Sequence, residues 1–293
     1  MLRVNSSKMK YIVFGGGFIG SSLTRNLRHN NHYVITIDRN PPRHSQHIGL
    51  CEHYIWKDIS NLDNFPDQYG IDGVFQTCGM MPNGSNNDEL FANNYNINKS
   101  VIKFCRKNSI KNIFFASSAW ASNPINSYGS EKLSSESNYT AFARETRCNV
   151  KIGRIGNIYG TFTNHGLIYD MCKRVFGAES EVCIYGNSIA TRSFLHIDDC
   201  IDGILTLMNS GVNDPAFIGS DEMHTIKSIT QKIIEVSGKP LEIKSTIEFQ
   251  ENSYACDNSV LRSLGWSQRI MIEDGIRQVY SEFEFESSIK HAT

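Results

Sequence analysis

In the N-terminal part of the chain, continuous apolar runs alternate with apolar residues at helical spacing. Residues 11–14 form a short continuous apolar run, Ile19, Leu23 and Leu27 follow at helical spacing, and residues 32–38 form a second apolar run. A short continuous run is typical of a buried strand, and apolar residues three to four positions apart are typical of an amphipathic helix. The order strand, helix, strand predicts a βαβ unit with parallel strands and a right-handed crossover.

The same alternation continues as far as residue 160. We predict strands over 71–78, 110–118 and 150–160, and helices over 87–109 and 127–146. Strands that alternate with helices in this way form a doubly wound parallel sheet, so the predicted fold class is α/β. Beyond residue 160 the elements become shorter. We therefore predict a first domain over 8–160 and a smaller α/β domain over 161–293, with part of 190–207 returning to the first domain.

The composition is typical of a folded chain without a large charge excess. Among 293 residues, 40% are hydrophobic, and 29 Lys and Arg stand against 30 Asp and Glu, which gives a formal net charge of −1. This balance argues against nucleic acid or an anionic membrane as a partner. The longest apolar-leaning run, residues 11–24, is too short and too glycine-rich to span a membrane, and the first ten residues are too polar for a signal peptide. We expect a cytoplasmic protein.

Cysteine spacing argues against a disulfide framework and against a metal site. The eight cysteines form neither a C-x-x-C pair nor a Cys and His pair at zinc spacing. We therefore expect reduced, mostly buried thiols and no bound metal.

A glycine turn separates the first predicted strand from the first predicted helix. Its pattern, G-x-G-x-x-G, allows a tight turn, a close approach of the backbone to a pyrophosphate and close packing of the helix on the strand. The N-terminal amides of the helix would face the anion. This context predicts a dinucleotide-binding domain of Rossmann type. The turn residues expected to contact the cofactor are Gly15, Gly17, Phe18, Ile19 and Gly20.

Acidic residues end the second predicted strand and a short apolar segment after it. Asp38, eighteen residues after Gly20, ends the second strand, where a carboxylate can accept both ribose hydroxyls of the adenosine. Because Asp38 would repel a 2′-phosphate, it favours NAD over NADP, whereas the neighbouring Arg39 could do the opposite. Asp58 and Ile59 end another short apolar segment, at a place where an acid can bind the adenine amino group or serve as an ordinary turn residue.

Three Tyr-x-x-x-Lys pairs occur in the sequence. This spacing puts a phenol and an ammonium on one helical face, where the positive charge favours the ionised phenol and prepares it for general acid or base catalysis. Only the second pair opens a helix directly after a strand, and that strand delivers serines to the carboxyl edge of the sheet. We predict that this pair is catalytic and that the other two tyrosines pack beside solvated lysines. The pairs are Tyr95/Lys99, Tyr128/Lys132 and Tyr169/Lys173.

With these motifs in order, the chain resembles the extended short-chain dehydrogenases/reductases of the nucleotide-sugar epimerase/dehydratase family. The likeness runs from GGGFIG through YGSEK, RIGNIYG and TRSFLHIDD to NSVLRSLGW, and so covers nearly the whole chain. The resemblance implies NAD as cofactor, a nucleotide-diphosphate sugar as substrate, and a homodimer built from the helices at 87–107 and 128–146. It implies the catalytic residues Ser118, Tyr128 and Lys132, the substrate contacts Ser118, Asn157 and Arg192, and further cofactor contacts at Thr77, Cys78, Gly79, Asn94 and Ile155. We expect Arg192 in a loop before an apolar strand, which suits bidentate phosphate binding.

The sequence departs from the pattern of this family at several places. Phe14 stands at the first of three usual glycines, which implies a differently shaped pyrophosphate turn. Gln76 begins the Q-T-C-G that replaces the usual H-L-A-A beside the nicotinamide ribose. Only ten residues separate Ser118 from Tyr128, and the Arg expected before Asp257 as a pyrophosphate clamp is absent, so that Lys244 becomes a candidate for that role.

The residues after Ser118 narrow the reaction. The 4,6-dehydratases and glucuronate decarboxylases need an acid there, and this chain has Ala119 and Trp120. We therefore predict a 4-epimerase that acts by hydride transfer through a 4-keto sugar. The alternatives are an NAD(P)H-dependent 4-ketoreductase of a deoxysugar and a catalytically silent NAD-binding regulator. Cys78 and Cys105 leave open a third reaction, epimerisation of a carbon beside a ketone with a thiol as acid or base.

Overall fold

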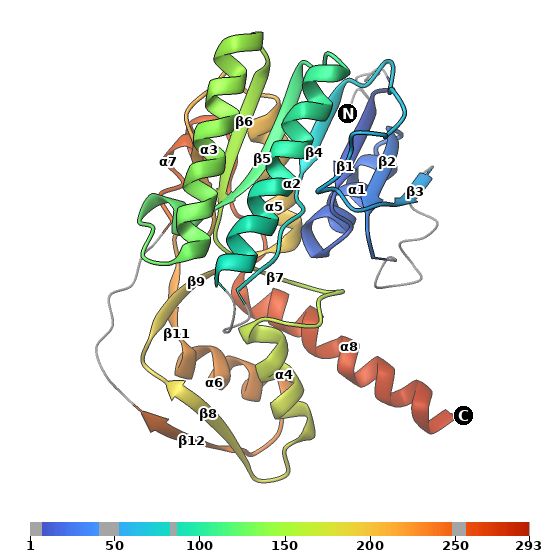
Figure 1. Cartoon of the computed structure of the whole chain (residues 1–293). Coiled ribbons are helices and arrows are strands. Elements are labelled where there is room, and N and C mark those ends of the chain that lie inside the picture. Colours follow the sequence, from blue (N-terminus) through green and yellow to red (C-terminus); the bar gives the residue numbers. More distant parts are fainter. Residues whose placement is uncertain (1–7, 41–52, 83–86, 248–255, 293) are drawn as a thin grey trace. The chain divides into compact units, whose positions relative to one another are not determined.

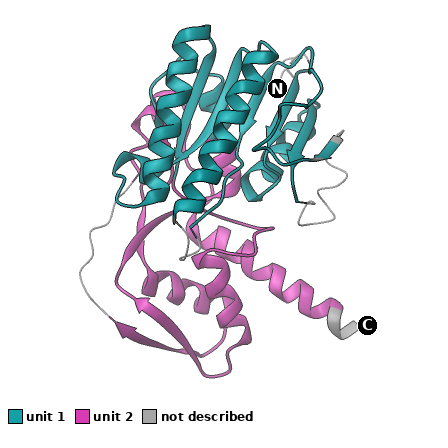
Figure 2. Ribbon diagram, viewed as in Figure 1, with its two compact units in different colours: residues 1–155, 204–216 teal, residues 156–203, 217–293 magenta. Residues whose placement is uncertain are grey.

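The computed structural model describes residues 8–40, 53–82, 87–247 and 256–292. The chain forms two compact units, coloured separately in Figure 2. Unit 1 contains residues 1–155 and 204–216, and unit 2 contains residues 156–203 and 217–293. The predicted domains, 8–160 and 161–293, stay a prediction.

Strands β1 to β6 and the later strand β10 form a seven-stranded sheet with the order β10-β6-β5-β4-β1-β2-β3 (Figure 1). The pairs β1–β2, β1–β4, β2–β3, β4–β5 and β5–β6 are all parallel. From β1 the chain runs outward to β2 and β3, and then returns to the other side of β1 with β4, β5 and β6, which is the doubly wound topology predicted from the sequence. The strands are β1 (Lys10–Phe14), β2 (Tyr33–Asp38), β3 (His53–Trp56), β4 (Gly73–Gln76), β5 (Asn112–Ser118), β6 (Asn149–Ile155) and β10 (Ala216–Ile218).

The reversal of strand order between β1 and β4 is important for function. In doubly wound sheets, ligands bind outside the carboxyl ends of the strands at such a reversal. The glycine turn follows β1 and the segment starting at Thr77 follows β4, so both lie at this point of the sheet.

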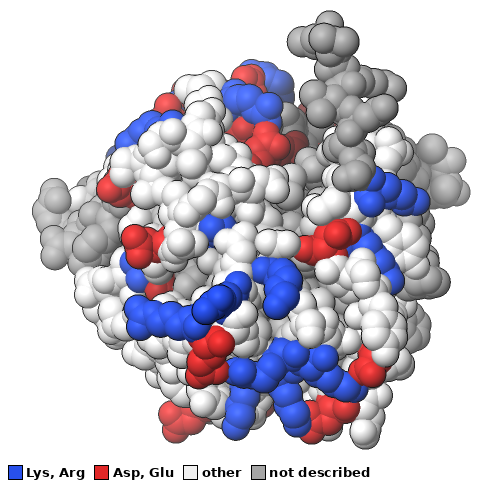
Figure 3. All heavy atoms as spheres, turned by 90° about the horizontal axis from the view of Figure 1, so that it is seen from above, with Lys and Arg blue, Asp and Glu red and all other residues white. Residues whose placement is uncertain are grey.

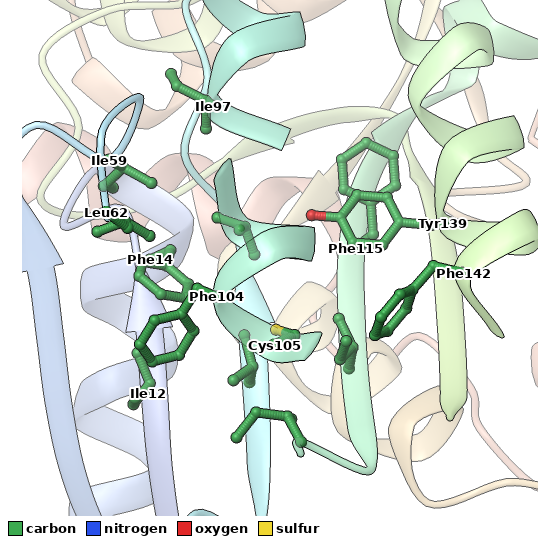
Figure 4. Close-up of a cluster of buried hydrophobic side chains, with 14 of the residues drawn as sticks. Ile12, Phe14, Ile59, Leu62, Ile97, Phe104, Cys105, Phe115, Tyr139 and Phe142 are labelled. Carbon is green, nitrogen blue, oxygen red and sulfur yellow. The ribbon is translucent and has the colours of Figure 1, made fainter. Parts of the chain in front are cut away.

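Helices cover the sheet of unit 1 on its two faces. Figure 1 shows α2 and α3 side by side over one face, and their apolar residues pack on the even-numbered residues of β1. Figure 4 shows this core, in which Phe14 meets Phe104 edge to face at 5.4 Å and Phe115 stacks on Tyr139 at 4.5 Å. The helices are α1 (Phe18–His29), α2 (Asn87–Lys107), the short 3-10 helix η2 (Ala119–Ser122), α3 (Ser127–Thr146) and α5 (Ile197–Met208), of which α5 crosses from unit 2 into unit 1.

Unit 2 has smaller sheets and its own core. A three-stranded sheet has the order β11-β9-β7, and β12 pairs with β8 in parallel. Apolar residues of α4, α6 and α8 pack together with residues of β8 and β9. The elements are β7 (Asn157–Tyr159), α4 (Leu167–Gly177), β8 (Glu181–Asn187), β9 (Thr191–His196), β11 (Met223–Thr225), α6 (Ile226–Ser237), β12 (Glu242–Ile247), α7 (Ser259–Ser263) and α8 (Ile272–Ala292).

One predicted element is wrong. The strand expected over 150–160 is interrupted at Gly156, where β6 ends and β7 begins a new pairing with β9. The amide of Gly156 donates to Ile218 O at 3.0 Å, and a β-carbon there would lie 3.0 Å from Cys256 Sγ. Glycine therefore allows the chain to leave the first sheet where a larger residue would be crowded.

Charged side chains on the surface are partly clustered. Figure 3 shows a group of basic side chains on one face, with acidic side chains among and around them. The ion pairs of α2 illustrate this mixing, since Lys103 pairs with Asp63 and Arg106 with Glu145, both at 2.7 Å. Among the residues that the structure describes, no helix is both long and apolar enough to cross a membrane.

Candidate functional site

The glycine turn has the geometry that a pyrophosphate requires. Gly15 has φ +101°, a conformation that side chains disfavour, and its amide donates to Ile37 O at 2.9 Å. A β-carbon on Gly20 would collide with the carbonyl of Gly15, whereas one on Gly17 would meet nothing within 4 Å. No acidic side chain lies in the first turn of α1. The turn therefore has open space beside a helix N-terminus, which fits an anionic dinucleotide.

Asp38 is fixed directly beside this turn. Its Oδ2 accepts from the amide of Gly16 at 2.7 Å, and its Oδ1 accepts from the amide of Asn40 at 2.8 Å. The carboxylate at the end of β2 thus lies where the sequence places a ribose-binding acid.

The acid after β3 is less closely tied to the turn. Asp58 is exposed, and the amide of Ser60 donates to its Oδ1 at 2.9 Å, which is the main cause that lowers the pKa of this carboxyl. Arg39 lies near enough to lower that pKa further. The side chain of Ile59 belongs to the hydrophobic core, so only its backbone remains available to a cofactor.

The segment after β4 is bound to the glycine turn on one side and to α2 on the other. Thr77 Oγ1 donates to Phe14 O at 3.0 Å, and Cys78 packs its backbone against Gly15. The side chain of Asn94 in α2 binds the backbone of Met80 twice: Oδ1 accepts from the Met80 amide at 2.7 Å, and Nδ2 donates to the Met80 carbonyl oxygen at 3.0 Å. These contacts hold the wall on which a nicotinamide ribose would lie.

Ser118, Tyr128 and Lys132 are all buried at the carboxyl end of β5 and the first turns of α3. The Lys132 ammonium donates to Ala116 O at 3.1 Å and lies 5.6 Å from the centroid of the Tyr128 ring. Its Nζ is also 3.6 Å from the position of a β-carbon on Gly79, which places it at the segment after β4. Lys132 can therefore reach both the phenol and that segment.

Two local features position the phenol. Asn126 caps α3 by accepting from the amide of Gly129 at 2.8 Å, which fixes where the helix begins. A β-carbon on Gly129 would lie 2.7 Å from Trp120 O, so glycine lets η2 pack directly on α3. Ser118 in turn caps η2 by accepting from the amide of Trp120 at 3.3 Å. The short connection between Ser118 and Tyr128 is thus a compact turn.

A buried ion pair supports the same region. Arg154 of β6 donates from Nε to Glu136 Oε1 at 3.0 Å and from Nη2 to Oε2 at 2.7 Å. Ser117 Oγ donates to the same carboxylate at 2.6 Å. Glu136 therefore joins β5, β6 and α3 directly beside Ser118, the predicted catalytic serine. No pattern in the sequence indicated this role of Glu136 and Arg154.

A second buried network joins α3 to the segment after β4. Asn98 Nδ2 donates to Glu131 Oε1 at 3.1 Å and to Ser135 Oγ at 3.0 Å. Gln76 Nε2 donates to Asn98 Oδ1 at 3.0 Å and to Cys78 O at 3.1 Å. Gln76, where the sequence departs from the family pattern, is therefore linked through Asn98 to Glu131, the residue before Lys132. No pattern in the sequence indicated this link.

Comparison with known proteins agrees with this geometry. The model of the NAD dependent epimerase/dehydratase family matches residues 11–219. The chain belongs to this family. This epimerase/dehydratase is therefore an extended short-chain dehydrogenase/reductase enzyme with NAD as its cofactor, as predicted from the sequence.

Individual relatives show the range of reactions within the family. The chain is 28% identical to GDP-mannose 3,5-epimerase of Arabidopsis thaliana, over 94% of this chain and 82% of the relative. It is 23% identical to UDP-glucuronic acid decarboxylase 1 of Danio rerio, over 94% of this chain and 72% of the relative. UDP-glucose 4-epimerase of Thermotoga maritima, solved with UDP-glucose, superposes with a TM-score of 0.83 at 20% identity, over 95% of this chain and all of that one. That last likeness shows the fold alone.

The other two tyrosines of the Tyr-x-x-x-Lys pairs pack on aromatic rings in this epimerase/dehydratase. Tyr95 stacks on Phe91 within α2, with centroids 6.4 Å apart. Tyr169 lies in unit 2 against Phe283, at 5.2 Å. Neither contact involves the residues around Ser118.

The predicted substrate residues lie in unit 2. Asn157 Nδ2 donates to Ser193 O at 3.1 Å. Arg192 was expected in a loop before a strand, but it lies within β9, paired with His224 of β11. Lys244 lies on β12, where Glu242 accepts from its ammonium at 2.6 Å and raises its pKa.

Proposed function

We propose that the protein is an NAD-dependent nucleotide-sugar 4-epimerase that works through a 4-keto-sugar intermediate. The observation that carries this proposal is the position of Tyr128 and Lys132 next to the segment after β4, with Ser118 at the end of the adjacent strand β5. Lys132 Nζ lies 3.6 Å from the β-carbon position of Gly79, and the Tyr128 hydroxyl lies 3.5 Å from Met81 Sδ. A general base and the wall of the cofactor site are thus adjacent.

Each of the three side chains has a task that its surroundings support. Tyr128 accepts the proton of the sugar C4 hydroxyl, with the Lys132 ammonium 5.6 Å from the centroid of its ring. Ser118 Oγ, already at the helix-capping position, donates to the sugar oxygen and holds it toward the phenol. When bound, NAD would supply the hydride acceptor for the first half-reaction, and its reduced form would supply the hydride donor for the second. Tyr128 then returns the proton after the keto sugar has turned its other face.

The residues after Ser118 disfavour decarboxylation and dehydration, and the burial of two cysteines disfavours 3,5-epimerisation. Ala119 and Trp120 follow the serine, and neither can serve as the acid that a decarboxylase or dehydratase requires there. A 3,5-epimerase must remove protons from carbon, and a thiol could do so only as a reactive acid or base. Burial raises the pKa of Cys78 to about 12 and raises the pKa of Cys105 well above its usual value, so neither cysteine suits that role.

Substrate recognition and assembly are parts of the same proposal. Asn157 and Arg192 are our candidates for contacts to the two phosphates of a nucleotide-diphosphate sugar, since a guanidinium can bind phosphate with two hydrogen bonds. The proposed homodimer would use the outer sides of α2 and α3. Size-exclusion chromatography with light scattering measures the assembly directly.

The test of the catalytic assignment is Tyr128→Phe. We expect a loss of kcat of about 10²- to 10⁴-fold on the nucleotide sugar that the wild type epimerises, because the proton acceptor is removed while the ring remains. Tyr95→Phe is the matched control, since Tyr95 has the same spacing to a lysine but stacks on Phe91. Unchanged activity of Tyr128→Phe would refute the catalytic assignment. Absence of activity in the wild type on every nucleotide sugar tried, with NAD bound, would favour a regulator.

Two measurements separate the epimerase from a 4-ketoreductase and identify the substrate. Denaturing the purified protein should release stoichiometric NAD if the cofactor is reoxidised in each cycle, whereas a ketoreductase exchanges its cofactor and would be purified without it. Screening nucleoside diphosphates by thermal shift identifies the base, since a ligand at a hundred times its Kd adds about 2.7 kcal/mol to stability.

A further inference from the structure

Tyr54 of β3 reaches the glycine turn although it is far from that turn in the sequence. In the parallel register of β2 and β3, Thr36 is the partner of Tyr54, so both side chains lie on the same face of the sheet. Thr36 Oγ1 lies 3.0 Å from Thr24 Oγ1 of α1, which identifies this face as the one that α1 covers. Tyr54 therefore points toward the beginning of α1.

The phenol of Tyr54 occupies the space that Gly16 leaves by lacking a side chain. A β-carbon on Gly16 would lie 3.0 Å from two ring carbons of Tyr54 and would collide with its hydroxyl oxygen. The φ of Gly16 is not positive, so its backbone conformation does not require glycine. A larger residue at this position would therefore force the Tyr54 ring to move.

The same contacts bring the phenol beside Asp38. The Tyr54 hydroxyl donates to Asn40 O at 2.9 Å. The amides of Gly16 and Asn40 are the two groups that hold the Asp38 carboxylate, at 2.7 and 2.8 Å. Tyr54 thus contacts both residues that fix the proposed ribose-binding acid.

We infer that Tyr54 is a specificity-determining residue that excludes NADP by filling the volume beside Asp38 that a 2′-phosphate would need. The inference rests on the proposed cofactor site. A 2′-phosphate is attached to the oxygen that Asp38 would bind, so it must lie next to this carboxylate. Asp38 opposes it by charge, and Tyr54 opposes it by occupying space. Arg39, which follows Asp38 in the sequence, would attract the 2′-phosphate that Asp38 repels. The volume that Tyr54 fills disfavours NADP whatever the balance of these two charges.

The experiment first removes any NAD that is purified with the protein. It then measures Kd for NAD and for NADP by isothermal titration calorimetry, without substrate, on wild type, Tyr54→Ala, Asp38→Ser and the double variant. We expect Tyr54→Ala to improve the NADP affinity relative to the NAD affinity. In the Asp38→Ser background the improvement should be about tenfold, because the carboxylate no longer repels the 2′-phosphate from the space that the tyrosine leaves. Tyr54→Phe keeps the ring and should retain the wild-type preference. Tyr69→Ala, an exposed tyrosine elsewhere in unit 1, controls for removal of an aromatic side chain.

The outcomes distinguish this inference from the function on which it rests. Equal changes of both Kd values in Tyr54→Ala would show a merely structural role and overturn the inference while leaving the cofactor site intact. A wild type that binds NADP as tightly as NAD would overturn it as well. A wild type that binds neither dinucleotide would overturn the cofactor site and the inference together. Melting temperatures of all variants show whether each is folded.

Discussion

The ion pair between Glu136 and Arg154 provides a quantitative test of what holds the end of β5, with the proposed catalytic residue Ser118, in place. We consider Arg154→Met, which keeps an unbranched apolar side chain and removes both hydrogen bonds to the carboxylate. The Glu136 side chain is only 5% exposed, so the variant leaves a buried carboxylate with Ser117 as its remaining side-chain donor among those described. Breaking a buried pair from one side costs about 3–5 kcal/mol. Because Arg154 is 20% exposed, we expect the lower end, about 3 kcal/mol.

Two further variants separate the effect of burial from that of a lost contact. Removing both partners, in Glu136→Leu/Arg154→Met, should cost much less than Arg154→Met alone, because no charge is then left unpaired. Arg106→Met is the matched surface control, since its pair with Glu145 has the same 2.7 Å distance but exposed fractions of 52% and 59%. It should cost about 0–1 kcal/mol.

The assay is urea-induced unfolding followed by far-UV circular dichroism, combined with hydrogen exchange of peptides from β5 and β6. Exchange reports the opening of these strands directly, which matters in a chain with two compact units. If Arg154→Met costs no more than Arg106→Met, or no more than the double variant, the reasoning about a buried unpaired charge is refuted.

Two other predictions follow from titration and burial. His32 accepts from the amide of Met9 at its Nδ1, and burial is the main cause that lowers its pKa, so folding favours the neutral ring. The neutral His32 ring should therefore contribute fully to the free energy of unfolding above the unfolded pKa of about 6.5. This contribution should be lost as the pH falls below that value, because the unfolded chain then binds the proton more readily than the folded one. His32→Asn should flatten this part of the urea-unfolding stability profile, and an unchanged slope would contradict the assignment. Since burial raises the pKa of Cys78 and of Cys172 to about 12, both thiols should resist iodoacetamide in the native protein and react in urea. Rapid native labelling of Cys78 in peptide mass spectra would restore a thiol acid or base as a candidate.

Local patterns in the sequence predicted most of unit 1. The runs at β1, β2, β4 and β5 are continuous and apolar because both faces of these strands are covered by helices, and the long helices between them have clear boundaries. The apolar run around Gly156 looked equally continuous. Its division into β6 and β7 depends on β9 as a new partner, and such a choice of partner is not encoded in the run itself.

Long-range contacts explain what the motifs could not predict at the site. The spacing of Tyr128 and Lys132 follows from one helix and could be recognised directly. Tyr54, by contrast, reaches Gly16 only because β3 pairs with β2 in a particular register. Arg192 was misplaced for the same reason, since its strand is defined by pairing with β11 rather than by its own apolar pattern.

The network of Gln76, Asn98 and Glu131 shows why an isolated departure from a family pattern is hard to interpret. Glu131 is fully buried beside Lys132 in the sequence, and among the described residues its Oε2 has no hydrogen-bond partner. Its other oxygen accepts from Asn98 and Ser135, and the side-chain carbonyl of Asn98 accepts from Gln76 and Tyr139. A change at one of these positions removes hydrogen bonds between buried polar groups, and each group that it leaves unsatisfied costs about 1–3 kcal/mol. Gln76 therefore does more than alter the wall of the cofactor site: it is one member of a set of buried polar residues that hydrogen bonds join.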